Sequence, residues 1–205
     1  MQRQALDFIL FHFPINNNIL DNEEKIALVR ASLQLLIKNE YSMTRRLFAW
    51  LIGSSQEDEI DLEDPEIKSM MGLLIGALKL LFKIEGSTKE KLGSGLKIID
   101  SLFKHQVKLV DFTLESVSID IIKCVEDYWL NSAMKANDEI IIKLQKFFKD
   151  YDVSYLDCLW TSLGKLIQKA NATENELSRT IEINETVRIL RFCLANVKVN
   201  GFLQI

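Results

Sequence analysis

The stretch Ser42-Met43-Thr44-Arg45-Arg46-Leu47-Phe48-Ala49-Trp50-Leu51-Ile52-Gly53 combines two adjacent arginines with an almost entirely apolar surface. At about 100° per residue, its apolar side chains cover more than half of a helix circumference, and the arginines occupy the narrow remaining stripe. Ser42 can cap the first turn, and Gly53 can adopt the left-handed conformation that ends a helix. We therefore expect a helix over residues 42–52 that is packed on several sides. Trp50 should lie in its core, and Arg45 and Arg46 should pair with carboxylates or carbonyls of neighbouring helices.

Similar apolar spacing continues along the chain, and only two prolines and eight glycines interrupt it in 205 residues. Few helix breaks are expected from this composition. Capping patterns mark helix starts at Asp64-Pro65, Ser87-x-x-Glu90, Ser154-x-x-Asp157 and Thr173-x-x-Glu176. Together these signals predict an all-α chain with helices over residues 2–13, 22–38, 42–52, 65–85, 88–106, 112–134, 138–150, 155–170 and 174–197.

The spacing of the predicted helices favours a solenoid. From residue 65 onward they begin about every 20 residues, and two helices per unit give the roughly 40-residue period of HEAT and armadillo stacks. We interpret residues 1–205 as one α-solenoid segment of antiparallel helix pairs, with a compact irregular helical bundle as the alternative. Both ends of the chain are apolar, as expected of a segment taken from a longer protein.

Residues 54–64 form the one long connection between predicted helices. The segment contains six carboxylates and no basic residue: Glu57, Asp58, Glu59, Asp61, Glu63 and Asp64. This composition is typical of a solvated, flexible loop. A basic partner docking on the loop is the alternative.

Composition and charge exclude several classes of function. The formal charge of −4 and the pI near 5.4 disfavour nucleic-acid binding, because phosphate contacts need a positive surface.

Cys124, Cys158 and Cys193 cannot all pair with one another, and each lies in an apolar helical context. They indicate reduced, buried thiols in a cytoplasmic protein, and the lack of a basic-then-apolar leader agrees.

The sequence offers little chemistry for catalysis. His12 and His105 are its only histidines, they fall in separate predicted helices, and no cysteine or carboxylate spacing near them suggests a metal cage. Neither a phosphate-binding loop nor a dinucleotide-binding glycine pattern follows a predicted strand. We therefore expect no enzyme, no metal site and no cofactor.

One segment is locally basic. Between residues 79 and 108, seven lysines stand against three carboxylates, a local charge of plus four. Lys97, Lys104 and Lys108 fall on one side of the predicted helix over residues 88–106 and its continuation. A solvated helix face explains these lysines, and the sharper hypothesis is a patch for anionic lipid headgroups, such as phosphoinositides, or for an acidic partner.

The run from Glu40 to Gly53 resembles the hallmark helix of the Dopey family, which has the form Asp-Met-Ser-Leu-Asn-Arg-Arg-Leu-Tyr-x-Trp-Leu-Leu-Gly. Phe48 stands where the family has tyrosine, which removes a hydroxyl group. Upstream, the predicted helix that ends before Phe13-Pro14 is similar to the family's preceding helix, which also closes on a Phe-Pro pair. The resemblance covers residues 1–53. Its signature positions, which we expect to be structural, are Arg45, Arg46, Leu47, Phe48, Trp50 and Gly53.

The resemblance implies a fragment from the N-terminal region of a much larger, non-enzymatic scaffold or adaptor. Dopey proteins act in vesicle-mediated protein transport as peripheral proteins of Golgi and endosomal membranes. Their implied partners are a protein similar to the large Arf exchange factors and an aminophospholipid flippase, and some members are linked to kinesin. The alternatives are an anionic-lipid-binding module, whose vesicle binding should weaken as salt rises, and a generic helical protein-interaction module, whose apolar contacts should not.

Overall fold

The computed structural model describes residues 2–15, 19–38, 41–52, 61, 63–83, 87–105, 109–131 and 139–196. Over these residues the chain is all-helical, as predicted, and no strand occurs among them. The predictions for Gly53, for Lys108 and for most of the acidic loop, residues 54–60 and 62, lie outside the described residues. The chain divides into two compact units.

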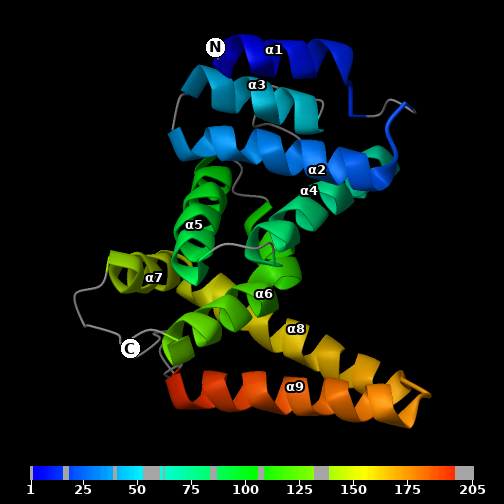
Figure 1. Cartoon of the computed structure of the whole chain (residues 1–205), viewed down its shortest axis with the longest axis vertical. Helices are drawn as coiled ribbons and strands as arrows, with labels where there is room; N and C mark the ends of the chain where they lie inside the picture. The colour runs from blue at the N-terminus through cyan, green and yellow to red at the C-terminus, as the bar shows by residue number, and fades with distance from the viewer. Residues whose placement is uncertain are drawn as a thin grey trace. The chain divides into compact units, whose positions relative to one another are not determined.

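Unit 1 consists of Met1–Ile84 and Lys97–Leu109. Its elements are α1 (Gln2–His12), α2 (Asn22–Leu33), the 3-10 helix η1 (Gln34–Lys38), α3 (Tyr41–Ile52), α4 (Pro65–Lys83) and the second half of α5 (Thr88–His105). Helix α3 packs against both α1 and α4, and α2 packs against α4. Figure 1 shows α1 and α3 side by side, in blue and cyan.

Unit 2 consists of Glu85–Leu96 and Val110–Ile205. It contains the first half of α5 together with α6 (Val110–Asn131), α7 (Glu139–Asp150), α8 (Asp152–Ala172) and α9 (Glu176–Asn196). Helix α8 packs against α6, and α9 packs against both α8 and α6. Figure 1 shows that α9 returns antiparallel to α8, so these two helices form a hairpin.

Several predicted helix starts are confirmed by their caps. The carboxylate of Asp64 accepts a hydrogen bond from the backbone N–H of Glu66 at 2.7 Å. The hydroxyl of Ser87 accepts one from the backbone N–H of Glu90 at 3.3 Å. Such bonds satisfy amide groups that have no partner within the first helical turn.

Three other predicted caps are wrong. Helix α3 already begins at Tyr41 and α8 at Asp152, so Ser42 and Ser154 lie inside the first turn rather than before it. The hydroxyl of Thr173 contacts the carbonyl of Lys169 and the carboxylate of Glu182. Asn175 caps α9 instead, because its side chain accepts from the backbone N–H of Ser178 at 3.0 Å.

Gly76 and Gly164 both lie within helices and form a matched pair for measuring helix packing. A Cβ at Gly76 would lie 2.9 Å from Cδ1 of Ile26, because α4 approaches α2 closely there. At Gly164 a Cβ would meet nothing within 4 Å. We expect Gly164→Ala to raise the free energy of unfolding by about 0.5–1 kcal/mol, since glycine is costly in a helix interior. Gly76→Ala should gain less, because Ile26 must move. Equal gains in urea-induced unfolding would contradict the close packing of α2 on α4.

Candidate functional site

The helix that carries the sequence signature, α3, holds α1 at two points. Nη1 of Arg46 donates to Oδ1 of Asp7 in α1 at 2.5 Å. Nε1 of Trp50 donates to the backbone carbonyl of Phe13, just after the end of α1, at 2.9 Å. Both partners of the ion pair are about half exposed, so it contributes only about 0–1 kcal/mol. The two contacts together fix the position of α1 on α3.

The inner side of α3 is apolar and buried. Leu47, Phe48 and Leu51 are at most 3% exposed. Trp50 is only partly buried, contrary to the predicted core position, and its indole N–H reaches the carbonyl of Phe13. Arg45 is exposed.

The outer side of α1 carries aromatic side chains, which the sequence did not mark as a surface. Phe8 is 57% exposed and Phe11 is 81% exposed. The imidazole of His12 contacts both rings, tilted against Phe8 with centroids 4.5 Å apart and edge-to-face with Phe11 with centroids 5.0 Å apart. Their spacing of three and four residues could have indicated a common helix face. We call Phe8, Phe11 and His12 the aromatic face. Exposed aromatic rings of this kind are enriched where proteins bind one another.

The predicted lysine patch is described at two of its three positions. Lys97 and Lys104 are both exposed, and seven residues separate them, which places them on one face of α5. Nζ of Lys104 lies 2.6 Å from Oδ2 of Asp100, so a carboxylate one turn away offsets part of its charge. The apolar side chains of the same helix, including Leu96 and Phe103, are buried.

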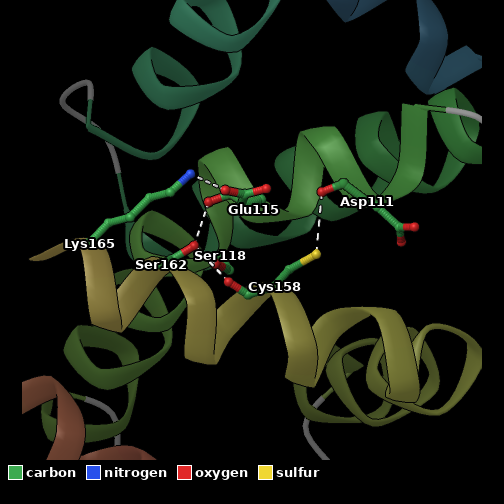
Figure 2. A network of polar contacts seen from close by, with 6 residues as sticks. All are labelled: Asp111, Glu115, Ser118, Cys158, Ser162 and Lys165. Carbon is green, nitrogen blue, oxygen red and sulfur yellow. Dashed lines mark hydrogen bonds and ion pairs between the residues drawn. The ribbon is translucent and has the colours of Figure 1, made fainter. Parts of the chain in front are cut away.

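Figure 2 shows a polar network between α6 and α8, which involves Asp111, Glu115, Ser118, Cys158, Ser162 and Lys165. The buried hydroxyl of Ser162 lies within hydrogen-bond distance of the backbone carbonyls of Glu115 and Cys158. Ser118 donates to Ser162 at 3.2 Å, and Lys165 forms an ion pair with Glu115 at the surface. The serine hydroxyls therefore join the two helices.

The thiols in unit 2 are poor nucleophiles. Sγ of Cys158 donates to the backbone carbonyl of Asp111 at 3.3 Å. Burial raises the pKa of Cys158 to about 11, and the charges of Asp111 and Glu115 add to that effect. Burial likewise raises the pKa values of Cys124 and Cys193 to about 11. Since the thiolate is the reactive form, these cysteines stay protonated and unreactive at neutral pH.

The described part of the chain lacks two further kinds of site. Its histidine, cysteine and carboxylate side chains nowhere gather in a group of three or more that could ligate a metal ion. Its helices include none that is both long and apolar enough to cross a bilayer.

The comparison that decides the family concerns the segment containing α1 and α3. Residues 1–56 match the family model described as "Dopey, N-terminal". The N-terminal segment of the chain is thus similar to the Dopey family. The Dopey match therefore includes Asp7, Phe13, Arg46 and Trp50, the residues that fix α1 on α3.

Relatives extend the Dopey similarity along the chain. The chain is 25% identical over 203 residues to "Protein DOP1 homolog" of Drosophila melanogaster, which covers 91% of this chain and 7% of that protein. It is 39% identical over 57 residues to "Protein pad-1" of Caenorhabditis elegans and 34% identical over 77 residues to "Protein DOP1B" of Mus musculus, which cover 28% and 34% of this chain and 2% and 3% of those proteins. The chain thus spans only a small part of the length of these relatives. No solved structure is significantly similar to it.

Proposed function

We propose that this chain is a non-enzymatic scaffold segment of a Dopey-like protein in Golgi–endosome membrane traffic. Its helices would form an α-solenoid of antiparallel pairs of the HEAT or armadillo type. The Dopey match over residues 1–56 supports the family role, and the α8–α9 hairpin supports the pairwise architecture. The protonated, buried thiols fit a segment that contributes binding and no catalytic step.

The observation that carries this proposal is the aromatic face on α1. Arg46 and Trp50, two positions of the Dopey signature, use their polar atoms to hold α1 and the residue after it. The same helix presents Phe8 and Phe11 to solvent. Burying a phenylalanine side chain against a partner releases roughly 1.5–3 kcal/mol. The signature thus orients a surface suited to binding another protein.

The partner that we propose for this surface is a protein similar to the large Arf exchange factors. An aminophospholipid flippase and kinesin are further candidates for the full-length protein. The chain would then be cytoplasmic and peripheral on Golgi and endosomal membranes, recruited through protein contacts.

Affinity capture tests the proposal with two matched variants. The immobilised chain is exposed to cytosol and to detergent extracts of Golgi membranes, and the exchange-factor-like partner is quantified by mass spectrometry. We expect Phe8→Ala/Phe11→Ala to lower its recovery by about tenfold or more, because exposed aromatic anchors dominate interfaces. The control is Leu130→Ala/Ile142→Ala, which removes two exposed apolar side chains of unit 2 and should leave recovery unchanged. Equal recovery by all three forms would contradict the assigned surface.

An anionic-lipid-binding module is the second candidate function, favoured by the exposure of Lys97 and Lys104 on one face of α5. Each lysine near an anionic bilayer contributes about 1 kcal/mol at best. The Asp100 carboxylate beside Lys104 and the overall charge of −4 oppose that attraction.

We therefore expect the chain alone to float poorly with phosphoinositide-containing vesicles at physiological salt. The same measurement on Lys97→Glu/Lys104→Glu/Lys108→Glu should give a similarly low bound fraction. Strong flotation of the unmodified chain, abolished in this variant, would favour the lipid module over the scaffold.

A further inference from the structure

Glu126 is a buried carboxyl group in the contact between α6 and α9, and the proposed function does not use it. The residue is 5% exposed. Its Oε2 lies 3.5 Å from Nη2 of Arg188 on α9 and has no hydrogen-bond partner among the described residues. The Arg188 side chain is 48% exposed, so solvent screens its positive charge. A carboxylate that is buried without full hydrogen bonding opposes folding in its ionised form.

The groups around Glu126 compensate its charge only in part. They are Lys123 and Asp127 on α6, and Arg188 and Cys193 on α9. Behind them, Glu185 on α9 pairs with Lys123, and Tyr155 on α8 interacts with Cys193. Lys123 also forms a 2.7 Å ion pair with Glu185, so it attracts a second carboxylate besides that of Glu126. Burial raises the pKa of Cys193 to about 11 and that of Tyr155 well above 10, so both are neutral at physiological pH. Arg188 is therefore the main counter-charge.

We propose that Glu126 and Arg188 form a pH-responsive clasp that tightens α9 on α6 as the pH falls from neutral into the mildly acidic range. The device depends on one buried carboxyl group and one partly exposed counter-ion 3.5 Å away. In the ionised state the clasp is weak, because the buried charge favours any opening that admits water. In the protonated state the same contact holds a neutral group and α9 packs more firmly.

The direction of the effect follows from proton linkage. Burial raises the pKa of Glu126 above its ordinary value of 4.5, and the attraction of Arg188 opposes that rise. A group whose pKa is raised on folding takes up its proton first in the folded state, so the packed form gains stability as the pH falls toward 4.5. Glu182 on the same helix acts in the opposite sense, because hydrogen bonds from Lys169 and Thr173 lower its pKa. The stability that Glu182 contributes is lost only below pH 4.5. The tightening of α9 on α6 is therefore confined to the range between neutral pH and about pH 4.5.

Peptide-resolved hydrogen exchange of the 205-residue chain between pH 7.5 and 5, with rates corrected for intrinsic exchange, tests the clasp. We expect the protection of α9 amides to rise measurably on acidification, because the packed form takes up the Glu126 proton first. Glu126→Gln should be more protected at pH 7.5 than the unmodified chain and should lose this pH dependence. Glu139→Gln, which removes an exposed carboxylate of α7, is the matched control and should retain it.

A second variant separates the clasp from a general effect on stability. Arg188→Gln removes the exposed counter-ion, so the carboxyl group should bind its proton at still higher pH and the rise in protection should begin nearer neutrality. Parallel pH profiles for the unmodified chain and Glu126→Gln would overturn the proposal. An unshifted profile for Arg188→Gln would also overturn it.

Discussion

Replacing Phe148 by alanine is expected to lower the free energy of unfolding by about 3–5 kcal/mol, the usual cost of removing a buried phenylalanine ring. Phe148 is 2% exposed. Its ring packs edge-to-face against Tyr155 of α8 with centroids 4.6 Å apart, and it lies 5.7 Å from the ring of Phe147. The substitution therefore leaves a cavity between α7 and α8. Urea-induced unfolding followed by circular dichroism measures the change.

Ile142 on the same helix provides the control for Phe148. Its side chain is 55% exposed, so Ile142→Ala should change the free energy of unfolding by no more than about 0.5 kcal/mol. Similar losses of stability for the two variants would mean that α7 does not pack on α8 through the face that carries Phe148.

Leu47→Ala should cost about 2–5 kcal/mol, because Leu47 is completely buried on the inner side of α3. Arg45, two residues earlier on the same helix, is exposed, and Arg45→Ala should stay within about 0.5 kcal/mol of the unmodified chain. Unfolding curves in urea distinguish the two variants. If Leu47→Ala proved as mild as Arg45→Ala, α3 would not be the packed helix that its sequence indicates.

Helical periodicity was sufficient to predict where the helices lie, because each helix buries one apolar face and short polar connections separate them. The prediction for residues 22–38 illustrates the limit. The chain there forms α2 and then a 3-10 helix from Gln34 to Lys38, and the apolar spacing alone does not distinguish these two geometries. Caps were less predictable. Thr173 and Asn175 are both good N-cap residues, but the hydroxyl of Thr173 contacts the carbonyl of Lys169 and the carboxylate of Glu182, and Asn175 forms the cap.

The candidate site was only partly predictable for a related reason. The sequence indicated that Arg45 and Arg46 need polar partners, but Asp7 becomes the partner of Arg46 only because α1 packs on α3. The exposure of Phe8 and Phe11 depends on which side of α1 meets α3, and α1 is short and apolar on more than one side. Glu126 looks like an ordinary charged residue in sequence. Only the packing of α9 on α6 makes it a buried carboxylate.

We propose that α3 holds α1 so that the aromatic face binds a protein partner. Hydrogen exchange of the 205-residue chain, with and without the captured exchange-factor-like protein, tests it most directly. The scaffold proposal predicts slower exchange for the amides of α1 (Gln2–His12) when the partner is bound, with little change in α5 around Lys97 and Lys104. Slower exchange confined to α5, with α1 unchanged, would contradict it.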